Sequence, residues 1–134
     1  MTLFSGIVIT GNGEANKLYN LPTANITGTP SGLPAGSYLA DATVRGFSYP
    51  ALIAIDTARD ITEAHLFGFS GELVSETLEL SIGDQIATWE PFTTIEAMRA
   101  KIALVTKLAR KFHNISWLCL LALFLVRRRF FMLK

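Results

Sequence analysis

The chain has 134 residues, of which half are hydrophobic and 17% are charged, and this is the size and composition of one folded domain. Such a composition excludes an intrinsically disordered chain, and a single cysteine, Cys119, excludes an internal disulfide. Residues 1–114 hold eight basic and eleven acidic residues, so their net charge is −3 although that of the whole chain is +1. A mildly acidic body without a basic cluster argues against nucleic-acid binding. The first residues show no secretory signal pattern, and we therefore expect a cytoplasmic protein.

Short segments between turn residues predict a β-rich fold for residues 1–92. Apolar or alternating runs of strand length cover residues 3–10, 37–45, 47–55, 62–69 and 77–82. In the run at 62–69, Ala64, Leu66 and Gly68 occupy one face, and Glu63 belongs to the other. The pair Gly83-Asp84 predicts a turn that ends the last strand-length run. Because no helical pattern separates these runs, they predict a small antiparallel barrel of five or six strands.

An amphipathic helix is predicted after the strands. Thr93 is the expected N-cap, and Glu96 three residues later would complete a capping box. Apolar residues then recur at steps of three or four: Ile95, Met98, Ile102, Val105, Leu108 and Phe112. This stripe predicts a helix that packs on the barrel.

The last twenty residues differ from the rest of the chain. Residues 115–126 are apolar except for Ser116, and arginines occupy positions 127–129. Twelve helical residues extend ~18 Å, which is less than the ~30 Å hydrocarbon core of a membrane. A buried or unpacked extension and an anchor lying in the membrane interface are both open alternatives. We therefore divide the chain into a domain at 1–114 and a tail at 115–134.

The segment NLPTANI at 20–26 is the candidate for chemistry. Pro22 restricts the backbone, and Thr23 and Asn25 leave the same face if the segment is extended. A hydroxyl and an amide oxygen at this spacing could bind Mg²⁺ together with substrate phosphates. Taken alone, the same residues fit an ordinary turn with local side-chain to backbone hydrogen bonds.

The order and spacing of several motifs resemble the riboflavin kinase family. The motifs are GIV at 6–8, GNG at 11–13, LPTANI at 21–26, GLPAGSYLADATV at 32–44, EAHLFGF at 63–69 and the amphipathic helix. The resemblance covers roughly residues 4–112. It implies a six-stranded antiparallel Greek-key barrel with a C-terminal helix. It also implies transfer of the ATP γ-phosphate to the 5′-hydroxyl of riboflavin, which forms FMN.

The resemblance further implies a role for particular residues. Thr23 and Asn25 would bind Mg²⁺ and the nucleotide phosphates, while Gly11 and Gly13 would let their loop approach the nucleotide. Glu63 would be the catalytic base that accepts the proton of the ribityl hydroxyl. These roles suit phosphoryl transfer, which depends mainly on positioning and charge neutralisation. Riboflavin and ATP are the expected partners, a divalent cation is the expected cofactor, and we expect a monomer.

The sequence also departs from the family pattern. The family has Arg-Gly at the position of Glu14-Ala15, Tyr-Gly at that of Val74-Ser75, arginine at that of Ala87 and aspartate at that of Val105. These changes reduce the expected nucleotide and flavin contacts. Riboflavin kinase activity is the leading hypothesis. The alternatives are a catalytically degenerate flavin- or nucleotide-binding module on the same barrel, or a membrane-associated interaction protein that acts through its tail.

Overall fold

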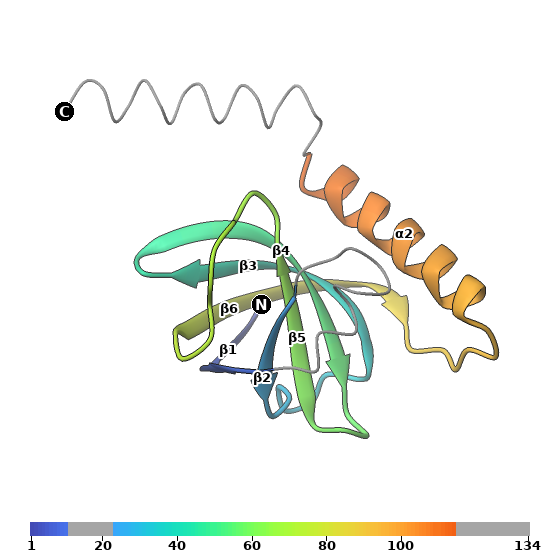
Figure 1. Ribbon diagram of the computed structural model, residues 1–134, viewed down its shortest axis with the longest axis horizontal. Helices are drawn as coiled ribbons and strands as arrows, with labels where there is room; N and C mark the ends of the chain where they lie inside the picture. Colours follow the sequence, from blue (N-terminus) through green and yellow to red (C-terminus); the bar gives the residue numbers. More distant parts are fainter. Residues whose placement is uncertain (11–22, 115–134) are drawn as a thin grey trace.

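The computed structural model describes residues 1–10 and 23–114, which form a closed antiparallel barrel with a helix against it (Figure 1). The elements are β1 (Thr2–Ile9), β2 (Ala24–Thr27), β3 (Gly36–Val44), β4 (Phe47–Asp56), β5 (Ile61–Leu66), β6 (Thr77–Thr88) and α2 (Ile95–Phe112). Their order around the barrel is β1-β2-β5-β4-β3-β6. Consecutive strands β3, β4 and β5 are neighbours, and β6 then returns to pair with β3, which is a Greek-key arrangement. The predicted six-stranded barrel with a C-terminal helix is confirmed.

Several expectations concern residues outside the described ranges. They are the roles of Gly11 and Gly13, the departures at Glu14 and Ala15, and the proposals for the tail at 115–134. Over the two ranges that the structure does describe, no helix has both the length and the hydropathy needed to cross a membrane.

Alternation of inward and outward side chains builds the barrel. In β3, every second residue from Gly36 to Val44 is buried, as expected for a strand with one face on a core. Inward residues from all six strands form a single core, whose largest fully buried side chains are Ile26, Ile53, Ile55, Leu78, Leu80 and Ile82. The hairpin between β3 and β4 closes through Arg45 and Gly46 with φ of 52° and 80°, the geometry of a two-residue type I′ turn.

Two strands end at different residues from those predicted. β5 stops at Leu66 instead of continuing to 69, because Gly68 adopts φ of 80° and the alternation breaks. Phe67 is then buried under α2, whereas Phe69 packs against the barrel core. β6 continues through residues 83–84, where a turn was predicted. Register shifts in the pairing with β3, on either side of Tyr38, let this long strand continue.

The predicted N-cap of the helix is wrong by one residue. Thr94 has the extended conformation of an N-cap, and its hydroxyl accepts a hydrogen bond of 3.1 Å from the Ala97 backbone N–H. Glu96 is therefore the second helical residue and not the third, so the predicted capping box does not form. Its carboxylate still lies in the first turn, where the helix dipole favours negative charge.

The apolar stripe of α2 is confirmed in its centre and wrong at its ends. Val105 and Ala109 are buried in a second apolar cluster with Leu52 of β4 and Phe67. Ile95 is 51% exposed and Phe112 is 61% exposed. At the C-terminal end, the inward face follows steps of four residues from Val105 through Ala109 to position 113, so Phe112 points away from the barrel.

Candidate functional site

Strands β2 and β5 bring two of the expected site residues together. Asn25 and Glu63 are Cα partners in the antiparallel ladder between these strands. Their neighbours Ala24 and Ala64 are 5% and 1% exposed and face the core. Because side chains alternate along a strand, Asn25 and Glu63 project side by side from the outer face. Directly opposed residues of this kind have Cβ atoms ~4.5–5.5 Å apart.

Thr23 supplies a second neutral oxygen beside this pair. Thr23 and Asn25 are on either side of the buried Ala24 in the sequence, and both are half-buried. The prediction that a hydroxyl and an amide leave one face is consistent with this burial pattern. Within residues 1–10 and 23–114, no group of three or more His, Cys, Asp and Glu side chains could hold a metal. Thr23 and Asn25 offer neutral oxygens of the kind that Mg²⁺ takes in small number, with water and substrate phosphates in the rest of its shell.

The pair is half-buried, and its ladder neighbours on the two sides differ in size. On one side Ile9 of β1 is the ladder partner of Asn25, and on the other Ala54 of β4 is the partner of Glu63. Ala54 is exposed, and its side chain is a single methyl group. Among the described residues, the strand neighbour of Glu63 on the β4 side is therefore a small side chain.

The C-terminal end of α2 packs against the strand segment that follows the carboxylate. The rings of His65 and Phe67 are buried and meet edge-on, with centroids 4.9 Å apart. The Phe67 ring also lies 6.1 Å from the His113 ring and 5.6 Å from the Arg110 guanidinium. His113 Nε2 donates a hydrogen bond of 3.0 Å to the Ala51 carbonyl oxygen. These contacts make His65 a packed residue and hold the end of β5 under the helix.

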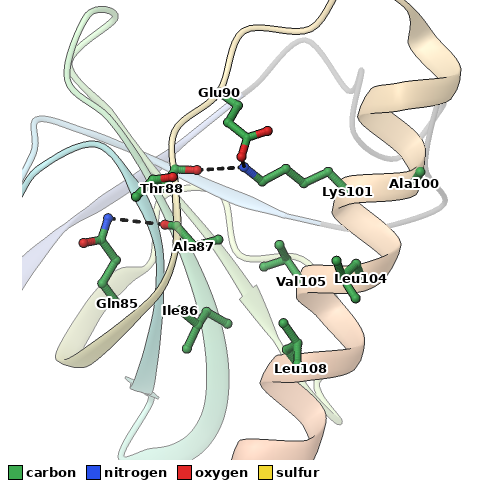
Figure 2. Close-up of a pocket in the computed structure, with 10 residues that line it drawn as sticks. All are labelled: Gln85, Ile86, Ala87, Thr88, Glu90, Ala100, Lys101, Leu104, Val105 and Leu108. Atoms are coloured by element: carbon green, nitrogen blue, oxygen red, sulfur yellow. Dashed lines mark hydrogen bonds and ion pairs between the residues drawn. The ribbon is translucent and has the colours of Figure 1, made fainter.

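A groove of about 700 Å³ lies between α2 and β6 (Figure 2). Ala87 and Val105, two of the departures from the family pattern, both line it. At its polar end, Lys101 Nζ is 3.0 Å from Glu90 Oε1 and 2.8 Å from the Thr88 carbonyl oxygen. Because β3 and β4 separate β6 from β5 in the barrel, this groove is distinct from the surface that carries the carboxylate. Ala87 and Val105 contribute apolar packing between the helix and the barrel.

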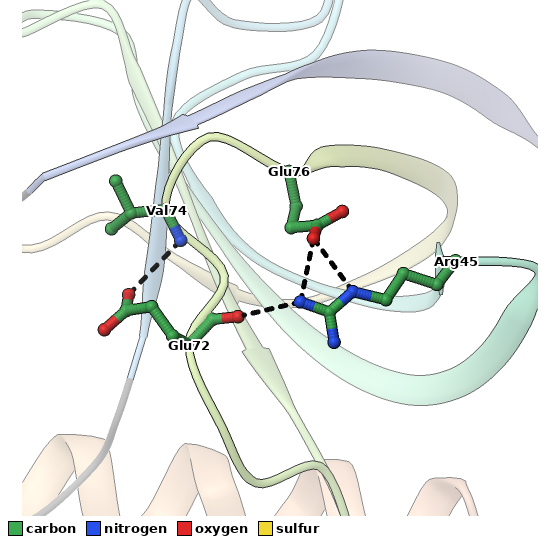
Figure 3. A network of polar contacts seen from close by, with 4 residues as sticks. All are labelled: Arg45, Glu72, Val74 and Glu76. Carbon is green, nitrogen blue, oxygen red and sulfur yellow. Dashed lines mark hydrogen bonds and ion pairs between the residues drawn. The ribbon is translucent and has the colours of Figure 1, made fainter.

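A polar network fastens the loop between β5 and β6 (Figure 3). Arg45 Nε and Nη2 each lie 2.8 Å from Glu76 Oε1, and Nη2 lies 3.4 Å from the Glu72 carbonyl oxygen. Glu72 Oε1 in turn accepts a hydrogen bond of 3.2 Å from the Val74 N–H. The β3–β4 turn therefore holds the loop that contains the departure at Val74 and Ser75.

The backbone of Ser75 explains why glycine suits this position. Ser75 has φ of 73°, in the left-handed region that costs an L side chain about 1–2 kcal/mol. Its N–H donates a hydrogen bond of 2.9 Å to the Val8 carbonyl oxygen and keeps the loop on β1. The serine therefore tolerates a conformation that glycine adopts without strain.

Sequence reasoning assigned no role to Thr62, which the structure places in the core. The alternation of the strand could have indicated a buried polar residue. Thr62 shares the inward face of Ala64 and Leu66 and is the polar member of that set. The Thr62 hydroxyl donates a hydrogen bond to the carbonyl oxygen of Gly28, the residue that follows β2, and so joins β5 to the end of β2.

Comparison with known proteins identifies the family. A family model described as riboflavin kinase matches residues 2–113. The chain belongs to the riboflavin kinase family. It is 36% identical over 110 residues to a bifunctional riboflavin kinase/FMN adenylyltransferase of Mycoplasma pneumoniae, and the match covers 79% of this chain and 40% of that protein. The chain thus spans less than half the length of this relative.

A solved structure is similar in fold. The crystal structure of a macrolide-efflux protein from Streptococcus pneumoniae superposes with a TM-score of 0.65 and 21% sequence identity. The similarity covers 81% of this chain and 36% of the other. At this identity the match concerns the barrel architecture alone.

Proposed function

We propose that the chain is a riboflavin kinase that transfers the γ-phosphate of ATP to the 5′-hydroxyl of riboflavin. The observation that carries the proposal is the ladder pair of Asn25 and Glu63 beside Thr23, on the outer face of a riboflavin kinase family barrel. It combines one carboxylate with two neutral oxygen donors. This is the chemistry that phosphoryl transfer to a hydroxyl requires.

Each side chain has a distinct role in the proposed reaction. Thr23 and Asn25 would hold Mg²⁺ through their oxygens, and the cation when bound would offset the negative charge of the phosphates. Glu63 would hold the ribityl hydroxyl in line with the γ-phosphate. As the hydroxyl oxygen bonds to phosphorus, Glu63 accepts its proton and the bond to ADP breaks. Half-burial of these groups limits competition from water.

A second candidate function is a flavin- or nucleotide-binding module without turnover. Ala87 and Val105 favour this candidate, because these apolar residues stand where the family has arginine and aspartate. The groove that they line therefore lacks two charged groups of the family. Formation of FMN separates the two functions, because a binding module binds riboflavin and leaves it unphosphorylated.

The test is incubation of the purified chain with riboflavin, ATP and Mg²⁺, followed by chromatographic separation of riboflavin from FMN. We expect Glu63→Gln to lower kcat by about 10²–10⁴-fold, the usual contribution of a general base. Glu79→Gln is the matched control, because Glu79 is an exposed carboxylate on β6, and its kcat should not change. A Glu63→Gln variant with near wild-type turnover would remove Glu63 from the mechanism.

A binding measurement tests the cation and nucleotide ligands separately. Asn25→Ala should weaken binding of MgATP in calorimetry while the far-UV circular dichroism spectrum stays that of the wild type. Unchanged affinity would contradict the role of Asn25. If the wild type binds riboflavin and forms no FMN, the binding-module function takes the place of the kinase.

A further inference from the structure

Thr62 is a fully buried polar residue next to the proposed catalytic base. It has 0% exposure and lies on the inward face of β5, with Ala64 and Leu66. Its Oγ1 donates a hydrogen bond of 2.8 Å to the Gly28 carbonyl oxygen. A buried hydroxyl is costly unless it is hydrogen-bonded, so this bond explains how the core accommodates threonine.

The same contact belongs to a group of bonds at the end of β2. Gly28 follows β2 with φ of 95°, and its N–H donates to the Asp60 carbonyl oxygen at 2.8 Å. Thr29 Oγ1 donates to Asp60 Oδ1 at 3.3 Å. Together with the Thr62 bond, these contacts fasten the chain after β2 to the start of β5.

β2 is the shortest described strand, and its position depends on two ladders and on the burial of Ala24 and Ile26. It has four residues, and its ladder with β1 contains two residue pairs, whereas β1 and β6 share six. Its ladder with β5 contains four pairs, one of which is Asn25 with Glu63. A shift of one residue would turn Asn25 toward the core. The register of β2 therefore decides whether Asn25 meets Glu63.

We infer that Thr62 is a positioning residue for the reaction, because its hydroxyl fastens the end of β2 and, together with the burial of Ala24 and Ile26, keeps Asn25 opposite Glu63. The inference rests on the proposed kinase function. Thr62 and Glu63 are consecutive residues of β5 and face opposite sides of the strand. Glu63, the proposed base, lies on the outer face, and Thr62, which holds the end of β2, lies on the inner face.

The test compares variants that differ in the hydroxyl group. Thr62→Val keeps the shape of the side chain and removes its donor to the Gly28 carbonyl. We expect kcat/KM for MgATP to fall about tenfold or more, since small misplacements of reacting groups have effects of this size. Both KM and kcat should change, because the register governs Asn25 and its placement against Glu63. Thr62→Ser keeps the hydroxyl and should restore most of the activity.

Thr106→Val is the matched control. Thr106 Oγ1 is buried and has no hydrogen-bond partner among the described residues, so its removal should leave the kinetics unchanged. All assays are run at a temperature where circular dichroism shows each variant fully folded. If Thr62→Val does not fold, Thr62→Ser and Thr62→Ala replace it, since these two create similar cavities and differ in the hydroxyl.

The outcomes separate the inference from the function on which it rests. Wild-type kinetics in Thr62→Val, or equal impairment of Thr62→Ser and Thr62→Ala, would overturn the positioning role. If the wild type makes no FMN, the proposed function fails and amide hydrogen exchange then tests the inference. Exchange in β2 should be about fivefold faster in Thr62→Val than in the wild type if one hydrogen bond of typical strength is lost. Unchanged exchange would overturn the inference independently of activity.

Discussion

The close approach of β1 and β2 depends on the missing side chain of Gly6. A Cβ at Gly6 would overlap Cγ2 of Ile26. Ile26 is fully buried, and its β-branched side chain has little freedom to rotate away. We therefore expect Gly6→Ala to overpack the core and to lower the free energy of unfolding by about 1–3 kcal/mol. Each kcal/mol corresponds to a fall in Tm of about 4–8 °C for a domain of this size.

A double-mutant cycle tests the proposed cause. Ile26→Ala alone should cost about 2–5 kcal/mol because it leaves a cavity. That cavity accommodates the new methyl group, so Gly6→Ala should cost nothing further in the Ile26→Ala background. Urea unfolding followed by far-UV circular dichroism gives the four free energies, provided that the m-values agree. The coupling free energy should equal the overpacking cost of Gly6→Ala.

Gly83→Ala is the control for loss of a glycine from a strand. A Cβ at Gly83 would lie 3.5 Å from the Leu39 carbonyl oxygen, which is an ordinary contact. This variant should be unchanged or more stable by about 0.5–1 kcal/mol, since alanine loses less backbone entropy on folding. A stable Gly6→Ala protein, or the same cost with and without Ile26→Ala, would refute the steric argument.

Three further predictions concern stability. Thr94→Ala should lower the free energy of unfolding by about 1 kcal/mol, because it removes the N-cap of α2, and Thr93→Ala should lower it less. Equal Tm values for these two variants would contradict the observed cap. Tyr38→Phe should cost about 1 kcal/mol at neutral pH, because the Tyr38 hydroxyl donates a 2.6 Å hydrogen bond to the Pro34 carbonyl oxygen. Burial raises the pKa of Tyr38, so wild-type stability is retained below the unfolded-state pKa of about 10 and falls as pH rises toward the folded-state value. Tyr38→Phe should lack this fall in pH-dependent Tm measurements. Ser75→Gly should raise Tm by relieving the φ of 73°, whereas Ser75→Ala should not.

Local chemistry was enough to predict five of the six strands approximately, and the side chains that share a face within them. Alternation along a strand and the backbone demands of turn residues act over a few neighbours, and both can be read from the sequence. For this reason Thr23 and Asn25 could be placed on one face, and Ala64 could be assigned to the face opposite Glu63. The resemblance to a family supplied the chemistry that these residues are expected to perform.

Tertiary structure decided which of these elements meet. Asn25 and Glu63 lie far apart in the sequence, and their pairing depends on the closure of the whole barrel. The continuation of β6 past residue 83 likewise depends on irregular pairing with β3, which no local pattern specifies. Thr62 became an anchor because the end of β2 presents a carbonyl oxygen to it. The sequence by itself determined which side chains share a face within each segment and which chemical groups they carry. Burial and long-range hydrogen bonding decided which segments pair with one another.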